Sequence, residues 1–170
     1  MLIKVIHVNG RYSPETNTHI PPDCIEPNYY SLLAERLSRY RGGAVLYCPN
    51  LVDYSAGSGY IDLDTQRRAL QSDPFLSRIG RLGGLVVRPD CLKPPDEYKQ
   101  DIRLEDELLR THGGAIVLGA YLGECVEATA LNLSERNPGY FVAVDPMHSI
   151  DRRVATIPEE YRGLPTASIA

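Results

Sequence analysis

Short apolar runs alternate with helical patterns along most of the chain. The runs that we interpret as buried strands are Ile3–Val8, Ala44–Cys48, Leu85–Arg88, Ala115–Leu118 and Tyr140–Val144. A near-continuous apolar composition is typical of strands that are buried on both faces of a parallel sheet. Between them we predict helices, from amphipathic spacing and capping residues, at Asn28–Tyr40, Asp73–Leu82, 103–112 and Glu124–Arg136.

This alternation predicts an α/β domain with one open, doubly wound, mainly parallel sheet and helices on both faces, a Rossmann-like architecture. The strands ending at His7, Cys48, Arg88 and Leu118 are expected to be neighbours. Ligands in such folds bind beyond the carboxyl ends of the strands. The segments 9–27 and 49–63 are rich in Pro, Asn, Ser and Gly. We expect them to lie over that edge as binding loops or lids.

The length and composition are those of one globular domain. The chain has 170 residues, of which 43% are hydrophobic and 24% charged, so a packed core is expected. We assign residues 1–150 to the α/β domain and 151–170 to a C-terminal tail that packs on or extends the same domain.

Charge and cysteine content narrow the class of protein. The formal net charge is −4 and the 18 basic residues are scattered, which does not favour nucleic-acid binding. The apolar runs are too short to span a membrane, and the N-terminus predicts a strand rather than a signal peptide. The four cysteines form no CxxC pair. Free thiols in a cytoplasmic protein are therefore expected, with two disulfides as the alternative in a secreted one.

Cys125 stands at a position suited to nucleophilic chemistry. It follows the strand Ala115–Leu118 and a turn, and it lies at the start of a predicted helix. At that position the helix amides and the helix dipole favour a thiolate and could receive an oxyanion. An inert buried thiol is the structural alternative.

The residues around Cys125 resemble the nucleophile segment of the isochorismatase-like cysteine hydrolases, with a glycine six residues before a Cys-Val pair and then Glu-Ala-Thr-Ala. Residues 139–145 are similar to the family's next strand and its terminal aspartate, and Leu85–Arg88 resembles the strand that ends in its catalytic lysine. Residues 5–12 resemble the first strand, whose pattern is Val-Ile-Asp-x-Gln-x-x-Phe. The resemblance implies an isochorismatase-like fold and an Asp–Lys–Cys triad. In that triad the aspartate takes the thiol proton, the lysine helps to hold charge and the cysteine attacks a carbonyl or imine-like carbon.

The positions that match this triad hold His7, Arg88 and Cys125. A neutral imidazole can accept the thiol proton and return it to a leaving group. Arginine keeps the positive charge but hardly donates a proton. The chain is therefore an altered hydrolase, a binding protein on an older scaffold, or a protein whose first strand aligns differently. For His7, a strand-end histidine bonded to the backbone is the alternative.

Further residues are expected to shape a substrate pocket beside the thiol. They are Asn9, Ala120, Tyr121 and Glu124. Glu124 could equally complement the dipole of the helix that follows. Metal-dependent members of the broader group place an aspartate and histidines after the second strand, whereas residues 48–54 contain no histidine. We therefore predict no catalytic metal and no other cofactor.

Four more polar residues could approach the same edge. His148 lies just past the last strand, and we interpret it as a loop histidine. Asp90, Asp96 and Asp101 follow Arg88. We interpret them as loop or helix-cap residues, although each could reach the site from that loop.

Two hypotheses follow for function. The first is a cofactor-independent hydrolase of a small amide, ester or vinyl-ether-like substrate, with Cys125 as nucleophile, His7 as base and Arg88 as charge stabiliser. The second is a noncatalytic small-molecule-binding or interaction protein that keeps the pocket. The reactivity of Cys125 relative to the other thiols separates them. The family resemblance also implies a homo-oligomer.

Overall fold

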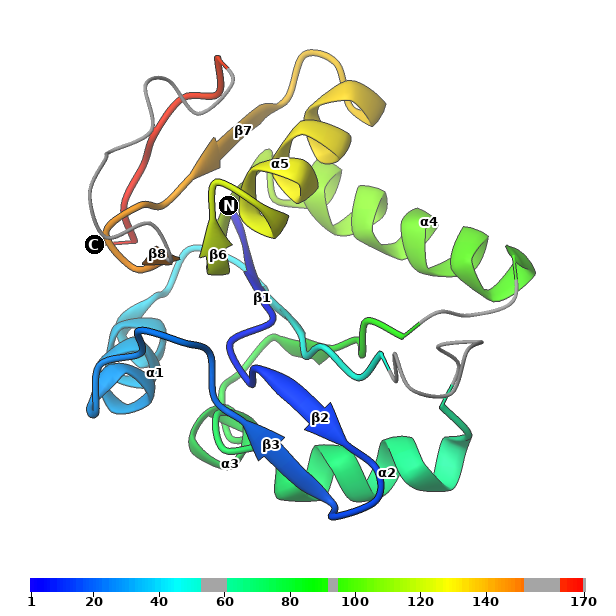
Figure 1. Ribbon diagram of the computed structural model, residues 1–170. Helices are drawn as coiled ribbons and strands as arrows, with labels where there is room; N and C mark the ends of the chain where they lie inside the picture. The colour runs from blue at the N-terminus through cyan, green and yellow to red at the C-terminus, as the bar shows by residue number, and fades with distance from the viewer. Residues whose placement is uncertain (53–60, 92–94, 152–162, 170) are drawn as a thin grey trace.

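The computed structural model describes residues 1–52, 61–91, 95–151 and 163–169. Its centre is a sheet with the strand order β5-β4-β1-β6-β7 (Figure 1). The bounds are Leu2–Ile6 (β1), Val45–Cys48 (β4), Leu85–Val87 (β5), Gly114–Leu122 (β6) and Phe141–Val144 (β7). Each neighbouring pair is parallel. The predicted α/β class and parallel sheet are confirmed, and the four strands expected to be neighbours are adjacent.

The strand order reverses its direction of growth at β1. From β1 the chain adds β4 and then β5 on one side, and it then crosses over to add β6 and β7 on the other. β6 passes very close to β1 at Gly119, where a Cβ atom would meet the carbonyl oxygen of Ile6 at 2.0 Å. In open α/β sheets the crevice beyond such a reversal point is the usual ligand site.

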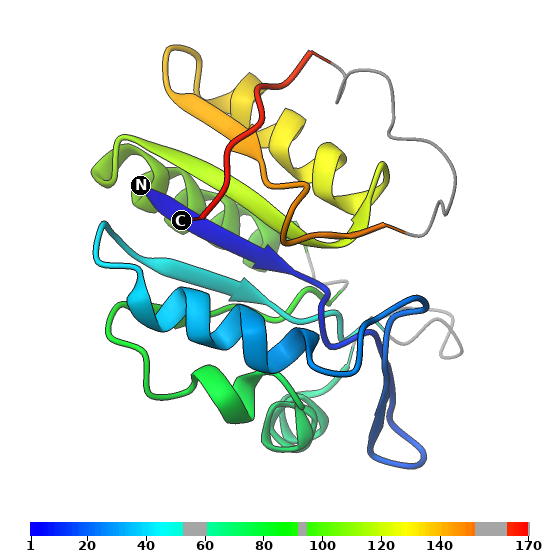
Figure 2. The same ribbon diagram turned by 90° about the vertical axis from the view of Figure 1, so that its left-hand side faces the viewer.

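Helices cover both faces of the sheet (Figure 1, Figure 2). One face carries α4 (Pro95–Thr111) and α5 (Cys125–Arg136), and the other carries α1 (Tyr29–Arg39) and α3 (Leu76–Ile79). Alternate residues of β1 point to opposite faces and so contribute to both cores. Leu2 and Ile6 belong to the core under α5, whereas Ile3 and Val5 belong to the core under α1.

Two elements lie in or next to segments for which the sequence predicts loops. The segment 9–27 contains an antiparallel hairpin of β2 (Arg11–Ser13) and β3 (Thr18–Ile20), which extends beyond the ends of β1 and β4 in Figure 2. The helix α2 (Leu63–Ser72) begins where the segment 49–63 ends. Strands of three residues are too short to show a periodicity. Residues 53–60 of the second segment lie outside the described residues.

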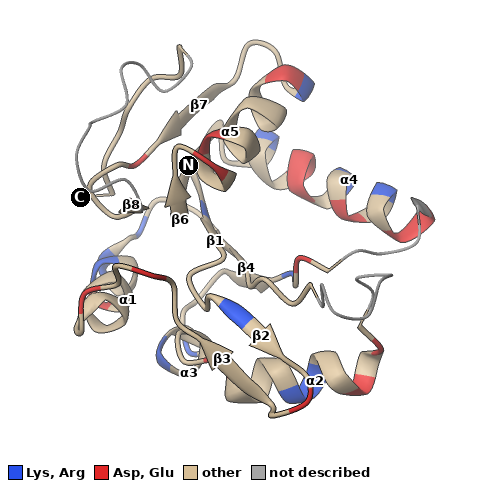
Figure 3. Cartoon of the chain, in the orientation of Figure 1, with Lys and Arg blue, Asp and Glu red and all other residues tan. Residues whose placement is uncertain are grey.

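The predicted helices differ from the observed ones mainly in length. The helix predicted from Asp73 is reduced to α3, and the Asp73 carboxylate accepts hydrogen bonds from the amides of Phe75 and Leu76 at its start. The helix predicted at 103–112 is the second half of α4. Acidic and basic residues are mixed along α2 and α4 (Figure 3).

The chain after β7 returns to the sheet. The short strand β8 (Ile150–Asp151) pairs with β6. Ile169 is buried in the core under α1, and its amide donates to Oδ2 of Asp145 at 2.9 Å. Among the described residues, no helix is long and apolar enough to cross a membrane.

Candidate active site

His7 and Cys125 lie on either side of the point where the strand order reverses. His7 directly follows β1, and Cys125 is the first residue of α5, which follows β6. Because β1 and β6 are paired, their carboxyl ends bring both residues to one crevice. This crevice holds a cavity of about 410 Å³, which we call the thiol cavity. Its lining includes His7, Ala120, Tyr121, Glu124 and Cys125 from the predicted set, and Gly10, Arg11, Ile20, Pro21, Pro22, Asp23 and Asn50.

The imidazole of His7 bonds to a carboxylate and lines the thiol cavity together with Cys125. Its Nε2 atom lies 2.7 Å from Oδ2 of Asp90, and its side chain is 17% exposed. Burial by itself lowers the pKa of His7, but hydrogen bonding to Asp90 and Cys125 and their charges outweigh it and raise the pKa to about 9. The imidazole is therefore protonated at neutral pH. This differs from the neutral base that the sequence suggests.

The backbone also fixes the position of His7. Its φ angle is 55°, in the left-handed region, which costs an L residue about 1 to 2 kcal/mol. Its amide donates to the carbonyl of Cys48, and its carbonyl accepts from the amide of Gly10. Strained conformations of this kind are concentrated at functional sites. Since the imidazole bonds to Asp90 and lines the same cavity as Cys125, His7 is more than a strand-end residue bonded to the backbone.

Asp90 completes this arrangement, and the sequence did not single it out. Its backbone is held by the loop after β4. The amide of Leu51 donates to the carbonyl of Asp90, and the amide of Asp90 donates to the carbonyl of Pro49. Its side chain is 55% exposed. The available signal was its place just beyond β5, at the edge where the strand ends converge. Sequence alone could not choose it over the other aspartates of the same loop and helix.

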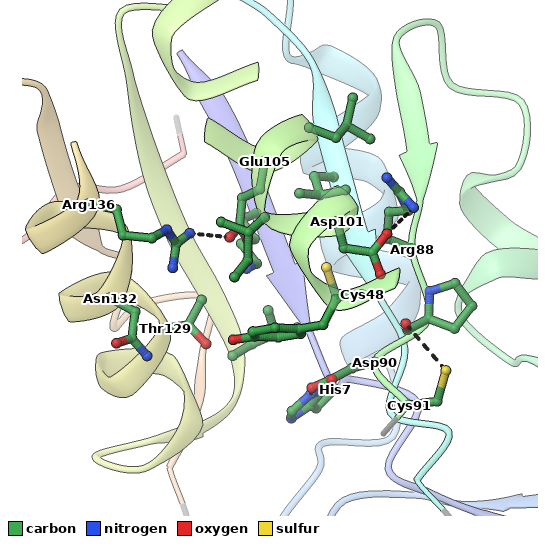
Figure 4. A pocket seen from close by; sticks show the side chains of 17 residues that line it. His7, Cys48, Arg88, Asp90, Cys91, Asp101, Glu105, Thr129, Asn132 and Arg136 are labelled. Atoms are coloured by element: carbon green, nitrogen blue, oxygen red, sulfur yellow. Dashed lines mark hydrogen bonds and ion pairs between the residues drawn. The ribbon is translucent and has the colours of Figure 1, made fainter. Parts of the chain in front are cut away.

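Arg88 lies in a different cavity from Cys125. It lines a cavity of about 200 Å³ beneath α4, the α4 cavity, where its guanidinium pairs with Asp101 (Figure 4). His7 lines both cavities, whereas Cys125 lines the thiol cavity and not the α4 cavity. The structure thus brings His7 to both cavities without bringing Arg88 and Cys125 into one. Asp96 lies in the first turn of α4, where its Oδ1 is 3.9 Å from Nζ of Lys99 in an exposed ion pair.

Asn9 links two loops at the edge of the site. Its side-chain amide donates to the carbonyl of Asn50 at 2.8 Å, and its Oδ1 accepts from the amide of Asn50 at 2.7 Å. Its Nδ2 also lies 3.1 Å from Nδ1 of His19. Asn9 is fully buried and lines neither of the two cavities. It therefore fixes the loop after β1 against the loop after β4, whereas the sequence suggests contact with substrate.

The turn before Cys125 is organised by α5 itself. The buried Glu127 accepts a hydrogen bond from the amide of Gly123, and Glu124 makes no capping hydrogen bond with its side chain. The hydroxyl of Tyr121 accepts from the amide of Asp23 at 2.8 Å. The first amides of a helix have no intrahelical acceptor. Those at the start of α5 are therefore available to an oxyanion beside Cys125.

His148 belongs to a separate hydrogen-bonded turn. Its Nδ1 lies 2.8 Å from Oδ2 of the fully buried Asp145, whose Oδ1 accepts from the amides of Met147 and His148. The carbonyl of His148 accepts from the hydroxyl of Tyr29. These contacts hold the chain after β7, so we assign His148 a structural role.

Comparison of the chain with protein-family models, curated proteins and solved structures finds no match. None of the four cysteines forms a disulfide. Within the described part of the chain, no group of three or more His, Cys, Asp or Glu side chains is placed to hold a metal ion.

Proposed function

We propose that the protein is a cysteine-dependent hydrolase of a small amide, ester or vinyl-ether-like substrate, built on an isochorismatase-like fold. The observation that carries this proposal is the hydrogen-bonded pair of His7 and Asp90 beside Cys125 at the reversal point of the sheet, where His7 and Cys125 line one cavity. A nucleophile, its acid–base partner and a group that orients that partner form the usual arrangement of enzymes with an activated nucleophile. The resemblance around Cys125 supports the same chemistry.

In the first half of the reaction, the Cys125 thiolate attacks the substrate carbonyl and forms a carbon–sulfur bond. The negative charge that develops on the carbonyl oxygen is stabilised by the amides at the start of α5. The His7 imidazolium then donates a proton to the leaving amine or alcohol as its bond to the carbonyl carbon breaks. Because Nε2 of His7 engages Asp90, we assign this transfer to Nδ1.

In the second half, the neutral imidazole takes a proton from water, and the resulting hydroxide attacks the thioester. The carbon–sulfur bond breaks, the carboxylic acid leaves, and the imidazolium–thiolate pair is restored. Asp90 acts by orienting His7 and stabilising its charged form, so it is a positioning residue. A vinyl-ether-like substrate has no acyl carbon. For such a substrate the His7 imidazolium would protonate the terminal vinyl carbon and the thiolate would add to the oxygen-bearing carbon; loss of the alcohol and addition of water would then release the ketone and restore the thiolate.

At this edge of the sheet, the charges of the ionic pair are exchanged relative to those that the family resemblance implies. There, the residue ending the first strand is an aspartate and its partner is a lysine. Here, the residue after β1 is the cation His7, and the residue beyond β5 is the anion Asp90. In this proposal the ionic partner of His7 is Asp90, and Arg88, for which the sequence suggested the role of charge stabiliser, does not act on the thiol.

The test combines thiol reactivity with hydrolysis. Iodoacetamide at pH 7 should alkylate Cys125 faster than the exposed Cys24, although Cys125 is half-buried, because the imidazolium favours the thiolate. His7→Ala should slow both alkylation and turnover of small amides and esters, and turnover by about two to four orders of magnitude. Cys24→Ser is the matched control and should leave both unchanged. If Cys125 reacts no faster than Cys24 and no substrate turns over, the hydrolase proposal fails in favour of a noncatalytic binding protein.

Two broader proposals accompany this one. Four cysteines without a disulfide fit a reducing compartment, so we propose a cytoplasmic location. The family resemblance supports a homo-oligomer.

A further inference from the structure

Lys4 occupies a position where an apolar residue is expected. It lies in the middle of β1 between Leu2 and Ile6, on the face under α4 and α5, and its side chain is 11% exposed. It pairs with Glu105 of α4, and burial lowers its pKa. Replacing a buried ion pair with apolar side chains is often neutral or stabilising. Packing alone therefore gives no reason for a lysine here.

Lys4 lies in the α4 cavity with two more cations. Figure 4 shows Arg136 on one side of this cavity, on α5, and Arg88 on the opposite side, beyond β5. The carboxylates that partner the three cations among the described residues all come from α4. They are Asp101 with Arg88, Glu105 with Lys4 and Arg136, and Asp106 with Arg136.

These ion pairs leave the cavity with a surplus of hydrogen-bond donors. A lysine has three N–H groups and an arginine has five. Lys4, Arg88 and Arg136 form four hydrogen bonds to described residues. Both oxygens of Glu105 already accept one each. The unused capacity therefore consists mainly of N–H groups. At the end of the cavity the positive charge of His7 is paired with Asp90, which also lines the cavity.

One side of the α4 cavity is formed by α5. Thr129, Asn132 and Arg136 line it and lie four, seven and eleven residues after Cys125, which places them on the same face of the helix. At a rise of 1.5 Å per residue, Asn132 is about 10 Å along the axis from Cys125. Lys4 precedes His7 by three residues, also about 10 Å along an extended strand. Along the axis of α5, Thr129 lies about 6 Å and Arg136 about 16 Å from Cys125.

We propose that the α4 cavity binds the carboxylate of a small organic acid, which Lys4, Arg88 and Arg136 hold by their unused N–H groups. A carboxylate fits better than a phosphate dianion, because the cations are already partly neutralised by α4. Apolar side chains such as Ile6, Leu46 and Ile102 line the rest of the cavity and suit a short hydrocarbon chain. The acid is either the free end of a substrate cleaved at Cys125 or a separate ligand. The first source rests on the proposed function, and the second does not.

Calorimetry on the Cys125→Ser protein tests binding without turnover. The probes are adipate, its monoamide and the neutral hexanamide. Adipate or its monoamide should bind, and Lys4→Met should weaken that affinity at least tenfold. Glu105 keeps Arg136 as a partner in this variant, so urea unfolding should show a folded protein. Arg67→Met, which removes an exposed cation from α2, is the matched control and should bind as the parent does.

Kinetics on the wild-type protein distinguish the two sources. If the acid is the far end of the substrate, the monoamide is hydrolysed with a kcat/KM at least tenfold above that of hexanamide, and Lys4→Met raises KM for the monoamide alone. If the acid is separate, adipate binds without competing with hexanamide. Either result supports the carboxylate site.

The proposal is overturned if neither acid binds the parent more tightly than it binds Lys4→Met. Should Lys4→Met fail to fold, Arg88→Met replaces it, because Arg88 is about a third exposed at the sheet edge; undiminished binding in that variant refutes the site. Rapid alkylation of Cys125 with no acid binding would refute the carboxylate site and leave the hydrolase proposal standing.

Discussion

Asp90→Asn gives the most direct test of the candidate triad, since it removes one charge and keeps the shape of the side chain. The pKa of His7 is about 9, against 6.5 for an ordinary imidazole, which corresponds to roughly 3 kcal/mol in favour of the imidazolium at 1.36 kcal/mol per pKa unit. Asp90 supplies part of this and Cys125 another part. Because Asp90 is more than half exposed, solvent screens its charge. We expect the asparagine variant to lower the pKa of His7 by about one unit, or about 1.4 kcal/mol.

The same change should reduce the reactivity of Cys125. A fall of one unit in the pKa of His7 shifts the equilibrium between the thiolate–imidazolium pair and the neutral thiol–imidazole pair about tenfold towards the neutral pair. The rate of alkylation by iodoacetamide at pH 7 should then fall by up to about tenfold. Asp96→Asn, at an exposed position of α4, is the control and should change neither quantity.

The assay pairs an NMR titration of the imidazole with the pH profile of alkylation followed by mass spectrometry. An unchanged titration of His7 in Asp90→Asn would show that the contact with Asp90 does not raise its pKa. An altered titration with an unchanged rate of alkylation would show that protonation of His7 does not control the reactivity of Cys125, and it would refute the triad.

Further predictions concern activity, stability and assembly. Cys125→Ala should abolish turnover while the free energy of unfolding in urea changes by no more than about 1 kcal/mol. The pKa of His7 is higher in the folded state, so its contribution to stability is complete below pH 6.5 and is lost as the pH rises to about 9. We expect the free energy of unfolding to fall by about 1 to 2 kcal/mol over that interval, and His7→Ala should remove this fall. Asp145→Ala should cost about 3 kcal/mol or more, measured in urea, because the buried carboxylate accepts from four N–H groups. Sedimentation at micromolar concentration should show a homo-oligomer, and a monomer alone would contradict that expectation.

The sequence by itself determined the layout of the central sheet. Each strand is a mainly apolar run that must be buried on both faces, so local composition was enough to place the five strands to within about two residues at each end, except that β6 continues four residues further, to Leu122. It also placed Cys125 at the start of a helix and His7 at the end of a strand, because these positions depend on local periodicity. The hairpin after β1 and the helix α2 were missed, since short strands and capped polar helices leave a weak pattern.

Tertiary structure alone decided which side chains meet. Asp90 reaches His7 because β5 lies two strands from β1 and the loop beyond it turns back over the sheet edge, a relation between residues 83 positions apart. Arg88, only two residues earlier, points under α4 and pairs with Asp101 instead. The sequence assigned no role to Lys4 within the predicted strand, and only the packing of α4 over β1 shows it to line a cavity. Apolar burial is encoded in local patterns, whereas ion pairs across elements depend on the crossovers that bring distant strand ends to one edge.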